Sequence, residues 1–229
     1  MSAVVLKKAS KFYEDGERRI VALDSVDLEI KEGEFTCLVG PSGSGKSTLL
    51  NLVGGLDTPS SGQVIIGDTD LAGLDSSALA DLRLHSIGFV FQAYNLIPVL
   101  SALENVEFVM HLQGVPSSQR RQRALEVLEK VGLKGLESRR PGQLSGGQQQ
   151  RVAVARAIVS KPRLVLADEP TANLDSKTAR NLVSLMEELH HKEGITFVFS
   201  THDPIVMELA DRVIKLHDGK IESDEIKHP

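Results

Sequence analysis

Short, almost wholly apolar runs recur along the chain, separated by longer segments whose apolar residues follow a helical period. The clearest runs are residues 35–39, 87–91, 164–167 and 196–200. Strands that are apolar on both faces are typical of a parallel sheet covered by helices. One intervening segment, 177–191, places Leu182, Met186 and Leu189 on one side of a helix. This alternation predicts an α/β fold with a mostly parallel sheet.

Other segments depart from this alternation. Residues 3–8 and 20–30 predict an antiparallel β subdomain, and Asp218-Gly219 lies at the turn of a predicted hairpin. A long stretch near the middle contains two helical patterns, at 101–112 and 118–131, and no strand pattern. We therefore expect one domain over residues 1–229, with a core formed by 1–92 and 144–229 and an inserted helical subdomain at about 93–143.

The charge pattern argues against two kinds of partner. A net charge of -5 with interspersed acidic and basic residues lacks the concentrated basic face of a nucleic-acid binder, so we expect no nucleic-acid partner. The longest stretch without charged side chains, 84–103, could cross a bilayer by length, but it contains Gln92, Asn95 and Pro98. A helix there would leave polar groups in lipid, so we expect a strand and a loop and no membrane span.

A few side chains are notable for their chemistry. Cys37 is the single cysteine and lies in an apolar run, so we expect it to be buried as a small hydrophobic residue in a reducing compartment. The pair His190-His191 lies near a predicted helix end without other metal-ligand types at suitable spacing, so we expect it to be solvated. No secretory signal pattern is found at the N-terminus, and we expect a cytoplasmic protein.

A phosphate-loop pattern follows the first buried strand. It reads Gly40-Pro41-Ser42-Gly43-Ser44-Gly45-Lys46-Ser47, and a predicted helix spans 46–53. The glycines let backbone N–H groups approach a phosphate, and the helix N-terminus adds partial positive charge. Lys46 is suited to bridge the outer phosphates, and the Ser47 hydroxyl can bind Mg²⁺. The flanking strand and helix distinguish this loop from an ordinary glycine-rich turn.

Two adjacent carboxylates follow the strand at 164–167. Asp168-Glu169 should face the phosphates, because ligands gather at the carboxyl ends of parallel strands. Asp168 suits the Mg²⁺ shell. Glu169 lies one residue further, where its carboxylate could accept a proton from an attacking water. The alternative is that Asp168 and Glu169 have no catalytic role and are only the charged end of a strand before a turn.

A second phosphate-binding pattern lies further along the chain. Leu144-Ser145-Gly146-Gly147-Gln148 precedes a predicted helix at 149–159, and Ser145 and Gln148 have the spacing of a capping box. This helix N-terminus offers N–H donors to a second phosphate group. One ATP molecule does not need two such sites in one chain, unless two chains share it.

With these motifs in this order, the sequence resembles the ABC (ATP-binding cassette) ATPase family over nearly its whole length. Residues 144–148 correspond to the family's signature and Gln92 to its Q-loop. Asn173-Leu174-Asp175 corresponds to the D-loop, and His202 to the switch histidine. Tyr13 lies where the family has an adenine-stacking aromatic residue, although Phe12 could supply that face or both could pack internally.

The resemblance implies a P-loop NTPase core and a set of site residues. The catalytic residues would be Glu169, His202, Gln92 and Lys46. The Mg²⁺ ligands would be Ser47, Gln92 and Asp168, and Asp175 would couple the two subunits of a dimer. ATP would be bound by Tyr13, Gly40, Pro41, Ser42, Gly43, Ser44, Gly45, Lys46, Ser47 and Thr48, and by Ser145, Gly146, Gly147 and Gln148.

The resemblance also implies partners. Two copies would pair head to tail, so that ATP held at 40–48 of one copy is closed by 145–148 of the other. The groove beside 93–98 would receive a helix of a separate integral membrane permease. The chain would then lie at the cytoplasmic face of the inner membrane, peripherally, through that partner.

Within the family, two stretches resemble the lipoprotein-releasing and macrolide-exporting ATPases. These are residues 54–62 and 166–171, whereas Thr171-Ala172-Asn173 departs from the Thr-Gly-Asn more usual in that group. The implied function is ATP hydrolysis that drives export or lipoprotein extraction. The alternative is a non-transport ATPase that regulates a membrane complex, such as cell-division or cell-wall machinery. A small-molecule kinase would not explain residues 144–148 or His202.

Overall fold

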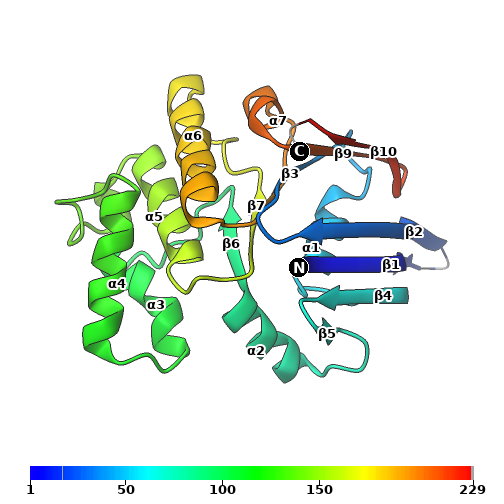
Figure 1. Cartoon of the computed structure of the whole chain (residues 1–229), viewed down its shortest axis with the longest axis horizontal. Coiled ribbons are helices and arrows are strands. Elements are labelled where there is room, and N and C mark those ends of the chain that lie inside the picture. Colours follow the sequence, from blue (N-terminus) through cyan, green and yellow to red (C-terminus); the bar gives the residue numbers. More distant parts are fainter. Residues whose placement is uncertain (17, 228–229) are drawn as a thin grey trace.

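The structure is a computed structural model that describes residues 1–16 and 18–227 (Figure 1). Six strands form a central sheet in the order β10-β9-β3-β8-β7-β6, and four form a second sheet in the order β2-β1-β4-β5. The elements in chain order are β1 (Ser2–Asp15), β2 (Arg18–Lys31), β3 (Phe35–Val39), α1 (Lys46–Val53), β4 (Ser61–Ile66), β5 (Thr69–Asp70), α2 (Ser76–Ser86), β6 (Ile87–Phe91), α3 (Ala102–Leu112), α4 (Ser117–Lys130), the 3-10 helix η1 (Pro141–Gln143), α5 (Gly146–Ile158), β7 (Leu164–Asp168), α6 (Ser176–Glu193), β8 (Phe197–Ser200), α7 (Pro204–Leu209), β9 (Arg212–His217) and β10 (Lys220–Ile226).

The central sheet is parallel except for β10, which pairs antiparallel with β9. Alternate residues of its strands enter two different apolar cores, as the period of a strand requires. Phe35, Cys37 and Phe199 pack with α3–α7 on one face. Leu38 and Leu166 pack on the other face with α1 and the antiparallel sheet. The expected parallel core, antiparallel β subdomain and buried Cys37 are thereby confirmed.

Several predicted boundaries agree with the structure. The helix expected at 46–53 is α1, and the apolar runs at 35–39 and 87–91 are β3 and β6. Helix α5 begins at Gly146, three residues earlier than expected, because Ser145 and Gln148 form a capping box that closes its first turn. The predicted C-terminal hairpin is present as β9 and β10, with Asp218 and Gly219 at positive φ in its turn.

Helix α5 packs very closely on strand β6. A Cβ atom at Gly88 would lie 2.3 Å from the Ala157 carbonyl oxygen, so only glycine permits this approach. Helices α3 and α4 lie beside α5 at the side of the molecule farthest from the antiparallel sheet (Figure 1). They share one core with the sheet, and the division into a core and a helical subdomain at 93–143 stays a prediction.

Some features differ from the sequence-based expectations. Helix α2 and strand β4 were not predicted, and α2 has no fully buried residue that could have signalled it. His190 is buried, which corrects the expectation that it is solvated. Its Nε2 lies 3.2 Å from Asp211 Oδ2, and Nδ1 lies 3.0 Å from the Ile195 carbonyl oxygen. The end of α6 packs against Phe35, and these two polar partners permit the burial.

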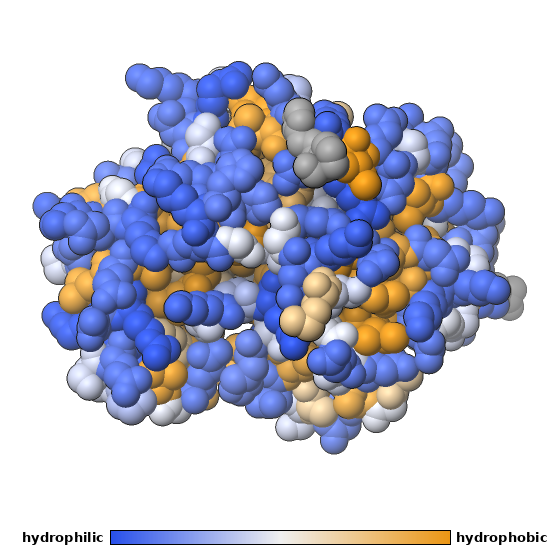
Figure 2. All heavy atoms as spheres, in the orientation of Figure 1, coloured by the Kyte–Doolittle hydropathy of each residue, from blue (hydrophilic) through white to orange (hydrophobic). Residues whose placement is uncertain are grey.

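The helices and the visible surface bear on the expectation that the chain has no membrane span. In the described residues, no helix is long and apolar enough to cross a membrane. The face shown in Figure 2 is mostly hydrophilic, with apolar atoms visible in separate patches. The segment 84–103 contains the end of α2, strand β6, a loop and the first two residues of α3, which agrees with the expectation of a strand and a loop.

Candidate functional site

The phosphate-loop residues 40–45 connect β3 to α1 and pack between β2 and β9. Gly40 and Gly45 have φ values of 151° and 101°. A Cβ atom would lie 2.3 Å from the Leu216 carbonyl oxygen at position 40, and 2.5 Å from the Ala22 carbonyl oxygen at position 45. Both positions therefore require glycine, for conformation and for space. The loop conformation is thus fixed by neighbouring backbone on two sides.

Lys46 begins helix α1 and folds back over the loop. Its Nζ donates to the Gly40 carbonyl oxygen at 2.7 Å and to the Pro41 carbonyl oxygen at 3.0 Å. A cavity of about 440 Å³ opens beside it. The cavity is lined by Ile20, Val21, Ala22, Ser42, Gly43, Gly45, Lys46, Ser47, Thr48, Asp168, Glu169 and Ser200. The fold therefore brings both carboxylates to the phosphate loop, as the sequence predicts.

Four of the residues that line this cavity were not predicted from the sequence. Ile20, Val21 and Ala22 come from β2 of the antiparallel sheet, and Ser200 ends β8. The strand pairing that places Ser200 opposite Asp168 joins residues that are far apart in the sequence. The adjacency of β8 to β7 would have been the signal, and it depends on the tertiary fold.

Asp168 ends strand β7 and is partly buried. Burial raises the pKa of its carboxyl group, more than the Ser200 hydroxyl and the Lys46 ammonium lower it. Neighbouring groups of the protein therefore do not fully offset the cost of burying the ionised Asp168 carboxylate. A bound cation would stabilise it, and oxygen ligands such as Asp168 and Ser47 are the type that Mg²⁺ prefers.

Glu169 has a left-handed backbone, with φ 45°, which is uncommon for a residue other than glycine. Its amide donates to the Ser200 carbonyl oxygen at 2.8 Å. Its Oε1 lies 2.8 Å from His202 Nδ1, and its Oε2 accepts a hydrogen bond from Thr201 Oγ1 at 3.0 Å. The His202 side chain is 78% exposed. The structure thus joins two predicted catalytic residues and adds Thr201, which the sequence analysis missed.

Gln92 follows β6 and contacts the predicted D-loop. Its Nε2 donates to Asn173 Oδ1 at 3.4 Å, and Asn173 Nδ2 donates to the Gln92 carbonyl oxygen at 3.0 Å. Gln92 is not among the residues that line the phosphate-loop cavity in the described chain. Its role as a metal ligand or catalytic residue stays a prediction.

Tyr13 lies near the tip of the antiparallel sheet and pairs with Ile20 across β1 and β2. Its hydroxyl donates to Asp57 Oδ2 at 3.1 Å, and Lys11 Nζ lies 5.3 Å from its ring centroid. The guanidinium of Arg19 lies 3.5 Å from the ring centroid of Phe12. Asp57 therefore fixes the Tyr13 ring by its hydroxyl and leaves it 40% exposed.

The second phosphate-binding pattern lies outside this cavity. Residues 145–148 begin α5, and a Cβ atom at Gly147 would lie 2.4 Å from Thr178 Cγ2. The Thr178 hydroxyl donates to Asp175 Oδ2 at 2.6 Å, and Asp175 caps the start of α6. In the described part of the chain, the phosphate loop and residues 145–148 therefore belong to two separate groups of site residues.

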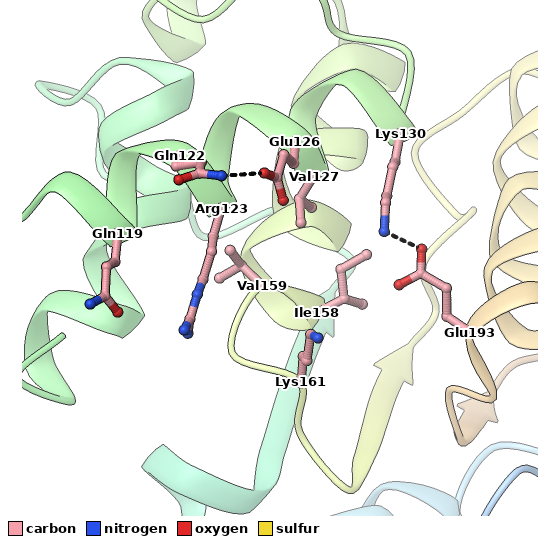
Figure 3. A pocket seen from close by; sticks show the side chains of 10 residues that line it. All are labelled: Gln119, Gln122, Arg123, Glu126, Val127, Lys130, Ile158, Val159, Lys161 and Glu193. Carbon is pink, nitrogen blue, oxygen red and sulfur yellow. Dashed lines mark hydrogen bonds and ion pairs between the residues drawn. The ribbon is translucent and has the colours of Figure 1, made fainter. Parts of the chain in front are cut away.

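Another cavity, of about 460 Å³, lies along α4 beside the carboxyl ends of α5 and α6 (Figure 3). Lys130 Nζ there lies 2.5 Å from Glu193 Oε1, and Arg123 and Lys161 line the same hollow. Cations at helix carboxyl ends offset the partial negative charge of the helix dipoles. Lys130 at the end of α4 is explained in this way, whereas Arg123 lies in the middle of α4, and we assign the cavity no ligand.

A groove of about 440 Å³ lies beside the loop that follows Gln92. It is lined by Leu56, Ala80, Arg83, Leu84, Ile87, Gly88, Phe89, Phe91, Asn95, Val109, Arg156, Ala157 and Ser160. Arg156 donates to the carbonyl oxygens of Tyr94 and Asn95, which both have positive φ. Its burial lowers the pKa of the guanidinium. The groove is thus mainly apolar. Its two arginine side chains are held by backbone carbonyl oxygens, Arg156 as described and Arg83 by that of Gly55.

Comparisons with known proteins agree with this geometry. A family model described as "ABC transporter" matches residues 23–172. The chain is 44% identical to the lipoprotein-releasing system ATP-binding protein LolD of Legionella pneumophila, over 98% of this chain and 100% of that protein. It is 49% identical to the macrolide export ATP-binding/permease protein MacB of Hyphomonas neptunium, over 96% of this chain but only 34% of that protein.

A solved structure is similar over almost its whole length. It is the dimeric post-hydrolysis state of the ATP-binding cassette MJ0796, bound to ADP and Pi. MJ0796 is a protein of Methanocaldococcus jannaschii. The TM-score is 0.89 at 46% identity, and the match covers 99% of each chain. The fold described above is therefore that of an ATP-binding cassette.

Proposed function

Because this chain belongs to the ABC transporter family, as an ATP-binding and ATP-hydrolysing subunit, we propose that it drives a separate integral membrane permease. Two copies would enclose two ATP molecules and convert their hydrolysis into movement of that permease. The family match supports the permease partner, and the observation that carries the proposed hydrolysis is the Glu169–His202 contact beside the phosphate-loop cavity. It joins a candidate base to a side chain that can hold the γ-phosphate.

The chemistry we propose consists of positioning and charge stabilisation. Backbone N–H groups of 40–48 and the Lys46 ammonium bind the phosphates. Glu169 orients a water molecule and accepts its proton, and His202 contacts the γ-phosphate. Gln92 reports the occupancy of the site to the rest of the chain.

Mg²⁺ fits the donor set at this site. Asp168 and Ser47 offer a carboxylate and a hydroxyl oxygen beside the phosphate loop. The described residues include no cluster of three or more His, Cys, Asp or Glu side chains that could hold a metal alone, and Mg²⁺ typically keeps water and phosphate oxygens as ligands. We propose that Asp168, Ser47 and Gln92 hold the ion. When bound, it neutralises charge on the phosphates.

The need for a second copy is supported by the separation of the two phosphate-binding patterns. Residues 145–148 do not line the chain's own phosphate-loop cavity in the described structure. The amides of Ser145 and Gln148 are used in the capping box, so the Gly146 and Gly147 amides are the donors proposed for a phosphate. In a head-to-tail pair, they would complete the ATP site of the partner, and Asp175 would lie next to that interface. The dimeric ADP-bound relative supports this arrangement.

The membrane partner is proposed to bind the groove beside Asn95. Leu56 there is 47% exposed, and a helix of the permease would cover it. The chain would thereby be held at the cytoplasmic face of the inner membrane. The LolD and MacB relatives support lipoprotein extraction or export as the work that this partner performs.

Replacing Lys46 by alanine should weaken ATP binding by about 10- to 100-fold, because a hydrogen bond to a charged group contributes roughly 1.5–3 kcal/mol. Equilibrium titration with ATP would measure the change in Kd. Lys7→Ala, which alters an exposed lysine on β1, should leave Kd unchanged. An unchanged Kd in Lys46→Ala would remove Lys46 from the binding site.

Purification of tagged Glu169→Gln protein with ATP and Mg²⁺ from detergent-solubilised native membranes tests the partner. We expect mass spectrometry to identify one stoichiometric membrane protein with few spans and a large outer domain. A many-span permease would instead indicate ordinary transport. A partner that belongs to division or cell-wall machinery would favour regulation over transport, and recovery of soluble proteins alone would refute the membrane-partner proposal.

A further inference from the structure

The two carboxylate oxygens of Glu169 have different hydrogen-bond partners. His202 Nδ1 lies 2.8 Å from Oε1, and its side chain is largely exposed. Thr201 Oγ1 lies 3.0 Å from Oε2, and Thr201 is 0% exposed. An exposed histidine can move when nucleotide or a second copy arrives, whereas the buried threonine cannot turn away without losing its contacts. Thr201 is thus the more rigid of the two supports.

The orientation of the Thr201 hydroxyl is itself determined by a neighbour. The Asp203 amide donates to Thr201 Oγ1 at 3.0 Å. An ionised carboxylate can only accept, so the single hydroxyl proton of Thr201 must be directed to Glu169. The backbone of Thr201 is fixed as well, because its amide donates to the Leu38 carbonyl oxygen at 3.2 Å.

A further hydrogen bond ties this group back to the segment that carries Glu169. Thr171 Oγ1 donates to Asp203 Oδ2 at 2.7 Å, and Asp203 Oδ1 accepts from the Ile205 amide at 2.9 Å. Thr171 is only 4% exposed and lies two residues after Glu169. Glu169, Thr201, Asp203 and Thr171 therefore form a closed ring of side-chain contacts and short backbone links.

The backbone of Glu169 is also held in an unfavourable conformation. A non-glycine residue at φ 45° is strained and persists only where its surroundings determine it. The Ser200 carbonyl oxygen holds the Glu169 amide, and Thr201 holds the end of its side chain. Both ends of the residue are thereby fixed by consecutive residues at the end of β8.

We infer that Thr201 is a positioning residue for ATP hydrolysis, whose hydroxyl fixes the Glu169 carboxylate for its contact with water, and that Asp203 and Thr171 fix this hydroxyl. The inference rests on the proposed role of Glu169 as the base. It assigns a function to a buried threonine that makes no contact with the phosphate-loop cavity in the described chain.

The test replaces Thr201 by valine, which has nearly the same shape but no hydroxyl. We expect kcat to fall by about 10- to 100-fold, since a small misplacement of a reacting group has an effect of this size. The KM for ATP and the ATP-dependent dimer of the variant should stay close to the parent. Thr201→Ser, which restores the hydroxyl, should recover most of the lost kcat.

A double-mutant cycle separates positioning from a purely structural role. In a Glu169→Ala background there is no carboxylate to position, so adding Thr201→Val should lower single-turnover hydrolysis no further. An equal fold-loss in both backgrounds would overturn the inference. So would a Thr201→Val variant with parental kcat. If the unchanged parent failed to hydrolyse ATP, the proposed function itself would be refuted instead.

A second variant covers the case in which Thr201→Val does not fold. Thr171→Val removes the hydrogen bond to Asp203 and leaves Thr201 in place. We expect a smaller loss of kcat at unchanged KM and unchanged melting temperature. Parental kcat in a folded Thr171→Val protein would contradict the ring of contacts as a positioning device.

Discussion

Glu169→Gln protein is expected to hydrolyse ATP about 10²- to 10⁴-fold more slowly than the parent, which is the range of a lost general base. Glutamine has nearly the same shape and keeps an oxygen that can accept the Thr201 hydrogen bond, but it cannot accept a proton from water. ATP should still bind, because Lys46 and the loop N–H groups are unchanged. Phosphate release under saturating ATP measures the loss.

The same variant should accumulate as an ATP-bound dimer, since closure no longer leads to hydrolysis. Size-exclusion chromatography with and without ATP would show the shift from monomer to dimer. Glu225→Gln, which changes an exposed carboxylate on β10, is the matched control and should retain the parental rate. Parental hydrolysis in Glu169→Gln would show that another group accepts the proton.

Ser145→Arg should abolish the ATP-dependent dimer and reduce hydrolysis to the level of an isolated monomer. Ser145 caps α5 at the position proposed to face the partner's triphosphate, and an arginine side chain would fill that space. Binding of ATP to the monomer should persist, because residues 145–148 do not line the chain's own cavity in the described structure. Dimer formation is best measured in the Glu169→Gln background.

Loss of the helix cap alone must be separated from this effect. Ser145→Ala removes the hydrogen bond to the Gln148 amide and should lower the free energy of unfolding by roughly 0.5–2 kcal/mol. Without added bulk, it should still form the dimer at high ATP concentration. If Ser145→Arg dimerised as well as Ser145→Ala does, the head-to-tail arrangement would need another contact surface.

The sequence predicted most strongly those elements whose signal is local. Strand β3 and helix α1 have their expected bounds because an apolar run, three glycines and Lys46 fix the strand, the loop and the helix start. Helix α2 escaped prediction because none of its residues is fully buried, so it has no marked apolar period.

Parts of the candidate site could not be predicted because they depend on contacts between distant segments. Thr201 meets Glu169 only because β8 pairs with β7, and Tyr13 contacts Asp57, which lies 44 positions further along the chain. His190 was wrongly expected in solvent, because its position in the last turns of α6 does not reveal that this end packs on β3. The sequence motifs thus identified the candidate site residues, whereas the order of the strands in the sheet determines which of these residues meet.

The close packing of Gly88 against Ala157 determines how the start of α5 can move. The two backbones touch there without an intervening side chain, so the end of α5 can pivot at this point but cannot approach β6 further. Ser145 lies twelve residues before Ala157, about 18 Å along the helix at about 1.5 Å per residue. A tilt of about 5° at the contact therefore displaces Ser145 by about 1.6 Å. Such a displacement would be large enough to make or break a phosphate hydrogen bond. Because α5 is buried from Gln150 to Ile158 at most positions, the elements packed on it would have to move with it.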